Sequence, residues 1–161
     1  RIAGLFGASL PTKILVDDIY KSAEVKLEPQ FYKPVGNQNE KVEQFVIHNN
    51  DIEKERVKIE GEPGELTAGI KKDVIISSKI FDPDRPGHVV IYGWHKLDGS
   101  AIQPETNIHK NSYVDYSHGI RLIKNKVLID EKEYLLEEVL KDPILFKIFS
   151  DENEPMHKAR Y

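Results

Sequence analysis

The stretch Asp73–Ser100 reads DVIISSKIFDPDRPGHVVIYGWHKLDGS and carries the strongest fold signal in the chain. Asp73–Ile80 is short and β-branched and His88–Trp94 is apolar, so each is typical of a strand. The two prolines of Phe81–Gly87 indicate a turn between them, and the Asp-Gly pair in Leu97–Ser100 indicates a tight turn after the second. The stretch therefore predicts neighbouring strands joined by short turns.

Two helices are predicted upstream of these strands. The first begins at Pro11, because proline in the first helical turn loses no hydrogen bond, and it ends before Pro29. The second runs from about Glu40 to Arg56 and follows a loop that contains Pro34. Its expected stripe on the buried side consists of Val42, Phe45, Val46, Asn49 and Ile52.

Downstream of the tight turn, the predicted elements are shorter. Ile102–Asn107 is expected to be irregular, and Ser112–Tyr116 is expected to be a short strand. Gly119–Ile123 and Lys126–Ile129 flank a Lys-Asn pair and are interpreted as a hairpin. Glu133–Leu140 is expected to form a short helix that ends before a proline.

The order of helices, then strands, then helices predicts an α+β fold. In it, N-terminal helices pack on a small, mainly antiparallel sheet, and short C-terminal helices follow. At 161 residues the chain is one domain, with or without a helical appendage. The expected division is a helical part over 1–60, a β-rich part over 65–150 that carries the site, and a polar, frayed tail over 151–161. The opening RIAGLFGASL is interpreted as the end of an element that begins upstream.

Composition excludes several classes of function. With 39% hydrophobic and 31% charged residues, the chain fits a soluble globular protein. Its interleaved charges and net charge of −4 give no electrostatic case for binding nucleic acid, and no apolar stretch approaches the roughly 20 residues that span a bilayer. The absence of cysteine excludes disulfides, Cys-ligated zinc and a Cys nucleophile. No Gly-rich phosphate-binding loop is present.

The segment Val89–Ile123 concentrates the residue types that functional sites use, including the only Trp and three of the six His. Its nitrogen and oxygen donors within 24 residues are His95, His109, Asp115 and His118. Three such ligands plus water are typical of a catalytic zinc site, so the three histidines are candidate ligands of a divalent metal such as zinc. The alternative is that these histidines hydrogen-bond the loop backbone beside a groove.

A second interpretation of the same segment is acyl-transfer chemistry. Asp115, Ser117 and His118 supply the three residue types of a catalytic triad. On a strand, Ser117 and His118 would point to opposite faces. His95 or His109 would then have to serve as the base for a Ser117 nucleophile. A Ser in such a turn is also typical of a backbone cap.

Four further side chains are candidates for substrate binding. Arg121 would anchor a carboxylate or phosphate, with a surface ion pair to a Glu as the alternative. Tyr92, Trp94 and Tyr116 would stack on a sugar and line a groove, with core packing as the alternative.

Several charged positions outside this segment are interpreted as having no role in the site. Lys71 and Lys72 precede a strand and are expected to be solvated loop charges, with entry of a Lys into the site from the strand edge as the alternative. His48 lies in a charged helix and His157 in the tail, and neither is given a function.

Ser117–Leu122 reads SHGIRL and resembles part of the SHGCxRL signature of the L,D-transpeptidases. In that family the Cys is the acylated nucleophile of peptidoglycan cross-linking, and a His-Gly motif lies upstream. The chain departs from this pattern, because no Cys follows Gly119 and Lys110 follows His109. The match covers six residues and implies at most a distant relative without the catalytic Cys.

Most of the chain also resembles a family of uncharacterised bacterial proteins. The similar segments are LPTKILVDDIY, AGIKKDVIIS, IYGWHKLDGSAIQP, YVDYSHGIRLI and LEEVLKDPILFKIFSDE. Members of that family are longer at the N-terminus, which implies a preceding portion here, and they tend to have His at the position of Ile70. The resemblance supports the location of the site and implies no activity.

Together these features predict an extracytoplasmic or secreted, hydrolase-like bacterial domain that acts on a polymer such as peptidoglycan or polysaccharide. The predicted catalytic residues are His95, His109, Asp115 and His118, and the predicted substrate-binding residues are Tyr92, Trp94, Tyr116, Ser117 and Arg121. The alternatives are a non-catalytic glycan- or protein-binding module and a subunit of an extracellular assembly. An enzyme requires at least two of the catalytic residues within hydrogen-bond reach, whereas a binding module requires an exposed aromatic strip. The oligomeric state stays open.

Overall fold

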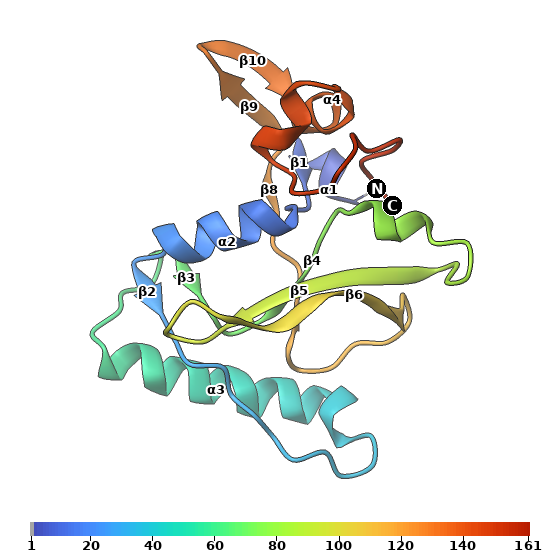
Figure 1. Cartoon of the computed structure of the whole chain (residues 1–161). Helices are drawn as coiled ribbons and strands as arrows, with labels where there is room; N and C mark the ends of the chain where they lie inside the picture. Colours follow the sequence, from blue (N-terminus) through green and yellow to red (C-terminus); the bar gives the residue numbers. More distant parts are fainter. Residues whose placement is uncertain (1) are drawn as a thin grey trace.

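The computed structural model describes residues 2–161 and has an α+β fold (Figure 1). Its central element is a four-stranded sheet in the order β6-β5-β4-β7. The strands of this sheet are β4 (Lys72–Val74), β5 (His88–His95), β6 (Ala101–Lys110) and β7 (His118–Gly119). Helix α2 (Lys13–Ser22) lies on one side of the sheet and α3 (Val42–Lys58) lies on the other.

Short elements surround this centre. The two-stranded pairs are β1 (Ala8–Ser9) with β8 (Ile123–Lys124), β2 (Val25–Lys26) with β3 (Thr67–Ala68), and β9 (Lys126–Ile129) with β10 (Lys132–Leu135). The short helices are α1 (Ile2–Leu5), α4 (Leu136–Lys141), η1 (Gln38–Glu40), η2 (Ser78–Phe81) and η3 (Leu145–Ile148). Among the described strands only β2–β3 and β4–β7 pair in parallel, so the predicted α+β fold with mainly antiparallel pairing is confirmed.

Helix α2 begins at Lys13, two residues after the predicted start at Pro11. Thr12 caps the helix, because its side chain accepts a hydrogen bond from the backbone nitrogen of Leu15 at 3.4 Å. On its buried side, Val16 packs in one cluster with Val90 and Tyr92 of β5. This contact covers one face of the sheet and leaves the other face to α3.

Helix α3 has nearly the predicted span, but three of the five residues of its predicted stripe, Val42, Val46 and Asn49, are exposed. Val42 is 74% exposed and Val46 is also exposed, whereas the buried residues of the helix are His48 and Ile52. The reason lies in the surface that α3 meets. His48 packs edge-on against the ring of Tyr116, so a polar aromatic side chain occupies the centre of the contact.

Two of the predicted strands differ from the observed ones. Of the predicted strand Asp73–Ile80, only the start pairs with β5, because the backbone nitrogen of Ile76 turns to the carbonyl of Pro11 at 2.8 Å. The irregular segment predicted at Ile102–Asn107 is wrong, since it lies within β6. Pro104 is tolerated there because β6 is an edge strand of the sheet.

The predicted hairpin and the predicted start of the last helix are also wrong. Lys126–Ile129 pairs with β10 through a turn at Asp130 and Glu131, which have positive φ angles of 49° and 65°. Such angles suit a two-residue hairpin turn. Strand β10 therefore takes the first part of the predicted helix, and α4 begins at Leu136. Ser112–Tyr116 is a loop, not a strand.

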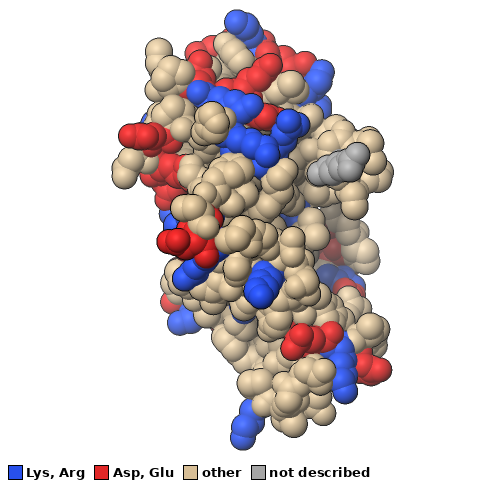
Figure 2. Space-filling view, turned by 90° about the vertical axis from the view of Figure 1, so that its right-hand side faces the viewer, with Lys and Arg blue, Asp and Glu red and all other residues tan. Residues whose placement is uncertain are grey.

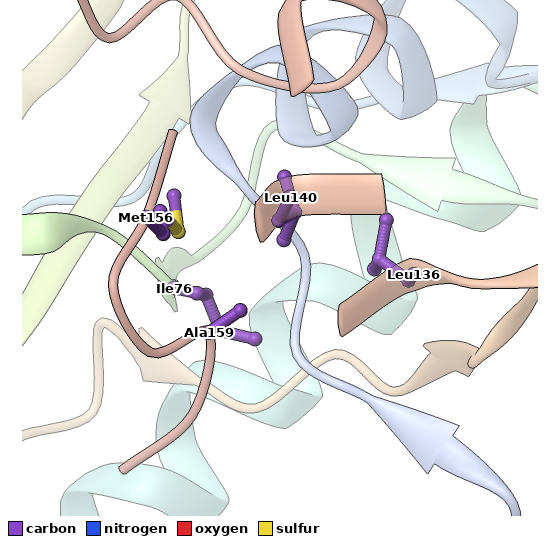
Figure 3. Close-up of a cluster of buried hydrophobic side chains, with 5 residues drawn as sticks. All are labelled: Ile76, Leu136, Leu140, Met156 and Ala159. Atoms are coloured by element: carbon purple, nitrogen blue, oxygen red, sulfur yellow. The ribbon is translucent and has the colours of Figure 1, made fainter. Parts of the chain in front are cut away.

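The C-terminal tail is packed against the domain, so the prediction that it is frayed is wrong. A buried cluster (Figure 3) consists of Ile76, Leu136, Leu140, Met156 and Ala159. The hydroxyl of Tyr161 donates to the carbonyl of Ile75 at 2.8 Å and accepts from the backbone nitrogen of Val90 at 3.0 Å. The few apolar residues of the tail thus attach it to both the sheet and α4. Because the residues between them are polar, the sequence does not indicate this packing.

The surface carries charges of both signs. Figure 2 shows one face, on which Lys and Arg side chains are intermingled with Asp and Glu side chains among uncharged residues. Within residues 2–161, no helix combines the length and the apolar character that crossing a membrane requires.

Candidate functional site

Two edges of the central sheet contribute histidines that meet. His109 comes from β6 and His118 from β7, and these strands are the two edge strands of the four-stranded sheet. The loop between them joins one edge to the other, and the two imidazole rings pack edge to face with centroids 5.1 Å apart. Tyr113 of this loop stacks on His109 at 4.6 Å. Together with Asp115 and Ser117 of the same loop, these residues form what we call the histidine cluster.

Asp115 is the buried carboxylate of the histidine cluster. Its Oδ1 accepts from the backbone nitrogen of Ser117 at 2.8 Å and from the Ser117 hydroxyl at 2.5 Å, and its Oδ2 accepts from the Tyr113 hydroxyl at 3.0 Å. Burial raises the pKa of Asp115, but hydrogen bonds from His118 and Ser117 outweigh burial and hold this pKa well below its usual range. The carboxylate is therefore charged at neutral pH, and the Ser117 hydroxyl is directed at it and not at a histidine.

His118 is held by Asp115 in a way that suits proton exchange. Its Nδ1 lies 3.1 Å from the backbone nitrogen of Asp115, which donates to a bare Nδ1, and 3.1 Å from Asp115 Oδ1, which accepts from a protonated Nδ1. Nδ1 therefore has a partner in either protonation state. Nε2 is buried and has no hydrogen-bond partner among residues 2–161. Nε2 is thus the ring nitrogen of His118 that the described residues leave without a partner.

His109 is the second imidazole of the cluster. It is half-buried, as is Tyr113 beside it, whereas Asp115, Ser117 and His118 are buried. Burial, followed by the charges of His118 and Lys72, lowers the pKa of His109. His109 is therefore held neutral at neutral pH.

Lys72 lies beside the histidine cluster and is half-buried, so its interpretation as a solvated loop charge is wrong. It sits on β4 directly opposite His118 in the strand register. Its ammonium lies 4.7 Å from the ring centroid of Trp94. Burial lowers the pKa of Lys72, and the charge of Asp115 acts in the opposite direction.

A second buried group borders the cluster, and sequence reasoning missed it. His48 is 0% exposed, and its Nδ1 lies 3.0 Å from the ammonium of Lys71, which also donates to the backbone carbonyl of Tyr116. Burial, and then the charge of Lys71, lower the pKa of His48 to about 4. Phe45, His48 and Ile52 share one helix face by their spacing, a signal that is found only if His is counted as a residue of the buried face.

His95 lies apart from the cluster, on the side of α2. Its Nε2 is 2.9 Å from Oδ1 of Asp17, and the same oxygen accepts from the Tyr92 hydroxyl at 2.8 Å. The ring of His95 stacks on Tyr20 at 4.6 Å. Asp17 and Tyr20 both belong to α2, so the structure places His95 in the contact between helix and sheet.

Arg121 is engaged within the protein. One of its terminal nitrogens donates to the carbonyl of Thr67 at 3.1 Å, and its Nε lies 3.7 Å from Oδ2 of Asp73. Burial raises the pKa of Asp73 to about 6, and Arg121 opposes this rise. The ion pair that the sequence leaves open is therefore made, but with a buried Asp instead of a surface Glu.

The three aromatic residues expected to line a groove are all more than nine-tenths buried: Tyr92, Trp94 and Tyr116. Trp94 packs against Phe31 with ring centroids 4.5 Å apart, and Tyr116 packs against Tyr32 at 4.8 Å. Of the two interpretations that the sequence leaves open, the structure shows core packing.

The three candidate metal ligands are not brought together, because His95 lies with α2. Across residues 2–161, no group of three or more His, Asp and Glu side chains is placed to hold a metal ion. A cavity of about 550 Å³ lies elsewhere, between the N-terminal segment and the C-terminal tail. No family model, curated protein or solved structure matches the chain.

Proposed function

We propose that the histidine cluster is the acid–base centre of a hydrolase-like domain, with His118 as the group that transfers the proton. One observation carries this proposal: Nδ1 of His118 has a partner in both protonation states, while Nε2 is left without one. An imidazole held in this way exchanges a proton at one nitrogen without losing its orientation.

The geometry suits both halves of a hydrolytic cycle. With Nδ1 protonated and bound to the Asp115 carboxylate, Nε2 accepts a proton from an attacking water. Once Nε2 has taken this proton, the imidazolium keeps its Nδ1–H on the Asp115 carboxylate and passes the Nε2 proton to the leaving group, which restores the starting tautomer. Between the two steps, the charged carboxylate of Asp115 stabilises the imidazolium of His118. His109, which is held neutral, adds a second imidazole against the ring of His118.

The same geometry favours an enzyme over a non-catalytic binding module. A module that binds glycan by stacking needs exposed aromatic rings, and Tyr92, Trp94 and Tyr116 are buried. An enzyme needs convergent acid–base groups, and Asp115 and His118 lie 3.1 Å apart.

The proposed substrate is an extracytoplasmic polymer such as peptidoglycan or a polysaccharide. Two features support this choice. The cluster is approached through the half-exposed side chains of His109 and Tyr113, and the resemblance of Ser117–Leu122 to a peptidoglycan-enzyme signature covers His118.

Replacing His118 by Gln is expected to reduce the rate of polymer hydrolysis about 100-fold or more, because positioned acid–base groups contribute that much. The measurement is the release of soluble fragments and new reducing ends from purified peptidoglycan and from a panel of bacterial polysaccharides. Asp115→Asn should show a similar loss, because the amide no longer stabilises the imidazolium.

The matched control is His157→Gln, which removes an exposed histidine of the tail and should leave the rate unchanged. Equal rates for the wild type and His118→Gln would contradict the proposal. So would the absence of fragments from every polymer together with retention of the protein on one of them, which would indicate a binding module.

A further inference from the structure

We infer that Lys72 is the anchor for an oxyanion carried by the substrate, so that the polymer is an acidic one. The inference rests on the proposed function and adds the class of substrate. It is carried by the half-buried ammonium of Lys72, which makes neither a hydrogen bond nor an ion pair within residues 2–161.

The charges around the cluster show why Lys72 differs from its neighbours. The ammonium of Lys71 is directed at Nδ1 of His48 and at the carbonyl of Tyr116. The carboxylate of Asp115 accepts from Ser117 and Tyr113 and contacts His118. Lys72, in contrast, has neither a hydrogen bond nor an ion pair among the residues that the structure describes. Its ammonium lies over the ring of Trp94, and the charge of Asp115 acts on it.

Keeping such a charge half-buried and unpaired is unfavourable in the free protein. Burial lowers the pKa of Lys72, which means that its charged form is disfavoured where it stands. An anionic ligand removes this penalty, and the attraction between the two charges is stronger beside the Trp94 ring than in open water. The unpaired charge of Lys72 therefore favours binding of a negatively charged group at this position.

Two ring nitrogens without partners belong to residues beside Lys72. Nε2 of His118, on the strand paired with β4, is buried without a partner among the described residues, as is Nε1 of Trp94. His118 and Trp94 are each more than nine-tenths buried, so these nitrogens are fixed in position. A ligand oxyanion at Lys72 would bring the reacting bond next to His118, because the two residues are register partners.

The chemistry that fits is an oxyanion of the polymer, either the carboxylate of an acidic sugar or peptide or the phosphate of a phosphodiester. A lysine ammonium is a compact point charge and binds both groups. A neutral glycan would leave Lys72 unpaired, and a cationic polymer would be repelled by Lys72 and Lys71.

Trp94 makes the inference directly measurable, because it is the only Trp in the chain and Lys72 lies on its ring. Titration with sodium acetate and, separately, with inorganic phosphate should produce a saturable change in Trp94 fluorescence at constant ionic strength. The stronger response identifies the carboxylate or the phosphate as the preferred group. Lys72→Gln should weaken binding at least tenfold, while Lys72→Arg, which keeps the charge, should retain it.

The matched control is Lys132→Gln. Lys132 also lies over an aromatic ring, that of Tyr134 at 5.0 Å, but on the β9–β10 hairpin, so its loss should not change the titration. Melting curves of each variant verify that it is folded. A linear, non-saturable response to both anions, or equal binding by Lys72→Gln, would overturn the inference.

The two proposals fail separately. His118→Gln is expected to bind the anions but not to hydrolyse polymer. Hydrolysis that depends on His118 but is equally fast on neutral and acidic polymers would support the acid–base centre and overturn the role of Lys72. Saturable anion binding at Lys72 without any hydrolysis would support the role of Lys72 and overturn the acid–base centre.

Discussion

Deleting residues 151–161 is expected to lower the free energy of unfolding by more than about 4 kcal/mol, which is a large share of the roughly 5–15 kcal/mol that stabilises an ordinary domain. The tail contributes Met156 and Ala159, each 3% exposed, to the cluster around Leu136 and Leu140. Removing them exposes the apolar faces of α4 and Ile76 to water. It also removes the two hydrogen bonds of the Tyr161 hydroxyl, one from the backbone nitrogen of Val90 in β5 and one to the carbonyl of Ile75 just after β4.

Single substitutions separate the contribution of the apolar cluster to stability from that of the Tyr161 hydrogen bonds. Met156→Ala should cost about 2–4 kcal/mol, because it opens a cavity in a packed cluster. Tyr161→Phe should cost about 1–3 kcal/mol, because it leaves the N–H of Val90 and the C=O of Ile75 unpaired. Urea denaturation followed by circular dichroism measures each change.

Ile144→Ala is the control for these variants, because Ile144 is apolar, C-terminal and 81% exposed, and its removal should cost little. An unchanged urea midpoint for the truncated chain would show that the tail is not part of the cooperative unit.

The parts of the fold that the sequence predicts are those set by local chemistry. Thr12 and Pro11 define the start of α2, and the Asp-Gly pair after β5 closes the hairpin with β6. The parts that it does not predict depend on contacts far along the chain. Pro104 is compatible with a strand only at a sheet edge. The tail packs against the domain only because Ile76 and Leu140 form an apolar surface that contacts it.

The candidate site, too, has features that the local sequence predicts and features that depend on contacts between distant residues. The crowding of His109, Asp115 and His118 is visible as composition, and the structure does bring these residues together. His95 looks equivalent in the sequence, yet its partner Asp17 lies 78 positions away in α2. Lys72 is marked in the sequence only by its position before a strand, and its place opposite His118 follows from the strand register.

Acidification is expected to weaken the fold through His48. The folded-state pKa of His48 is about 4, below its ordinary value of 6.5, so between these values the unfolded chain binds more protons than the folded one. The contribution of His48 to stability is therefore complete above about pH 6.5 and is lost as the pH falls toward 4, by about 3 kcal/mol in total. The cause is first the burial of the ring and then the ammonium of Lys71, while Asp51 and Asp115 act in the opposite direction.

The effect of His48 is measured as a difference, because another buried group has the opposite sign. Asp73, with its pKa raised to about 6, stabilises the folded state as the pH falls through 6, so the wild-type curve alone combines both groups. His48→Gln keeps an acceptor for Lys71 but does not titrate. Subtracting its stability curve from that of the wild type, measured by urea denaturation between pH 7 and pH 4, isolates His48 and should give a difference that falls steadily toward pH 4. His157→Gln, which removes an exposed histidine, should follow the wild type. A difference curve that is flat over this range would mean that His48 is not buried in its neutral form against Lys71.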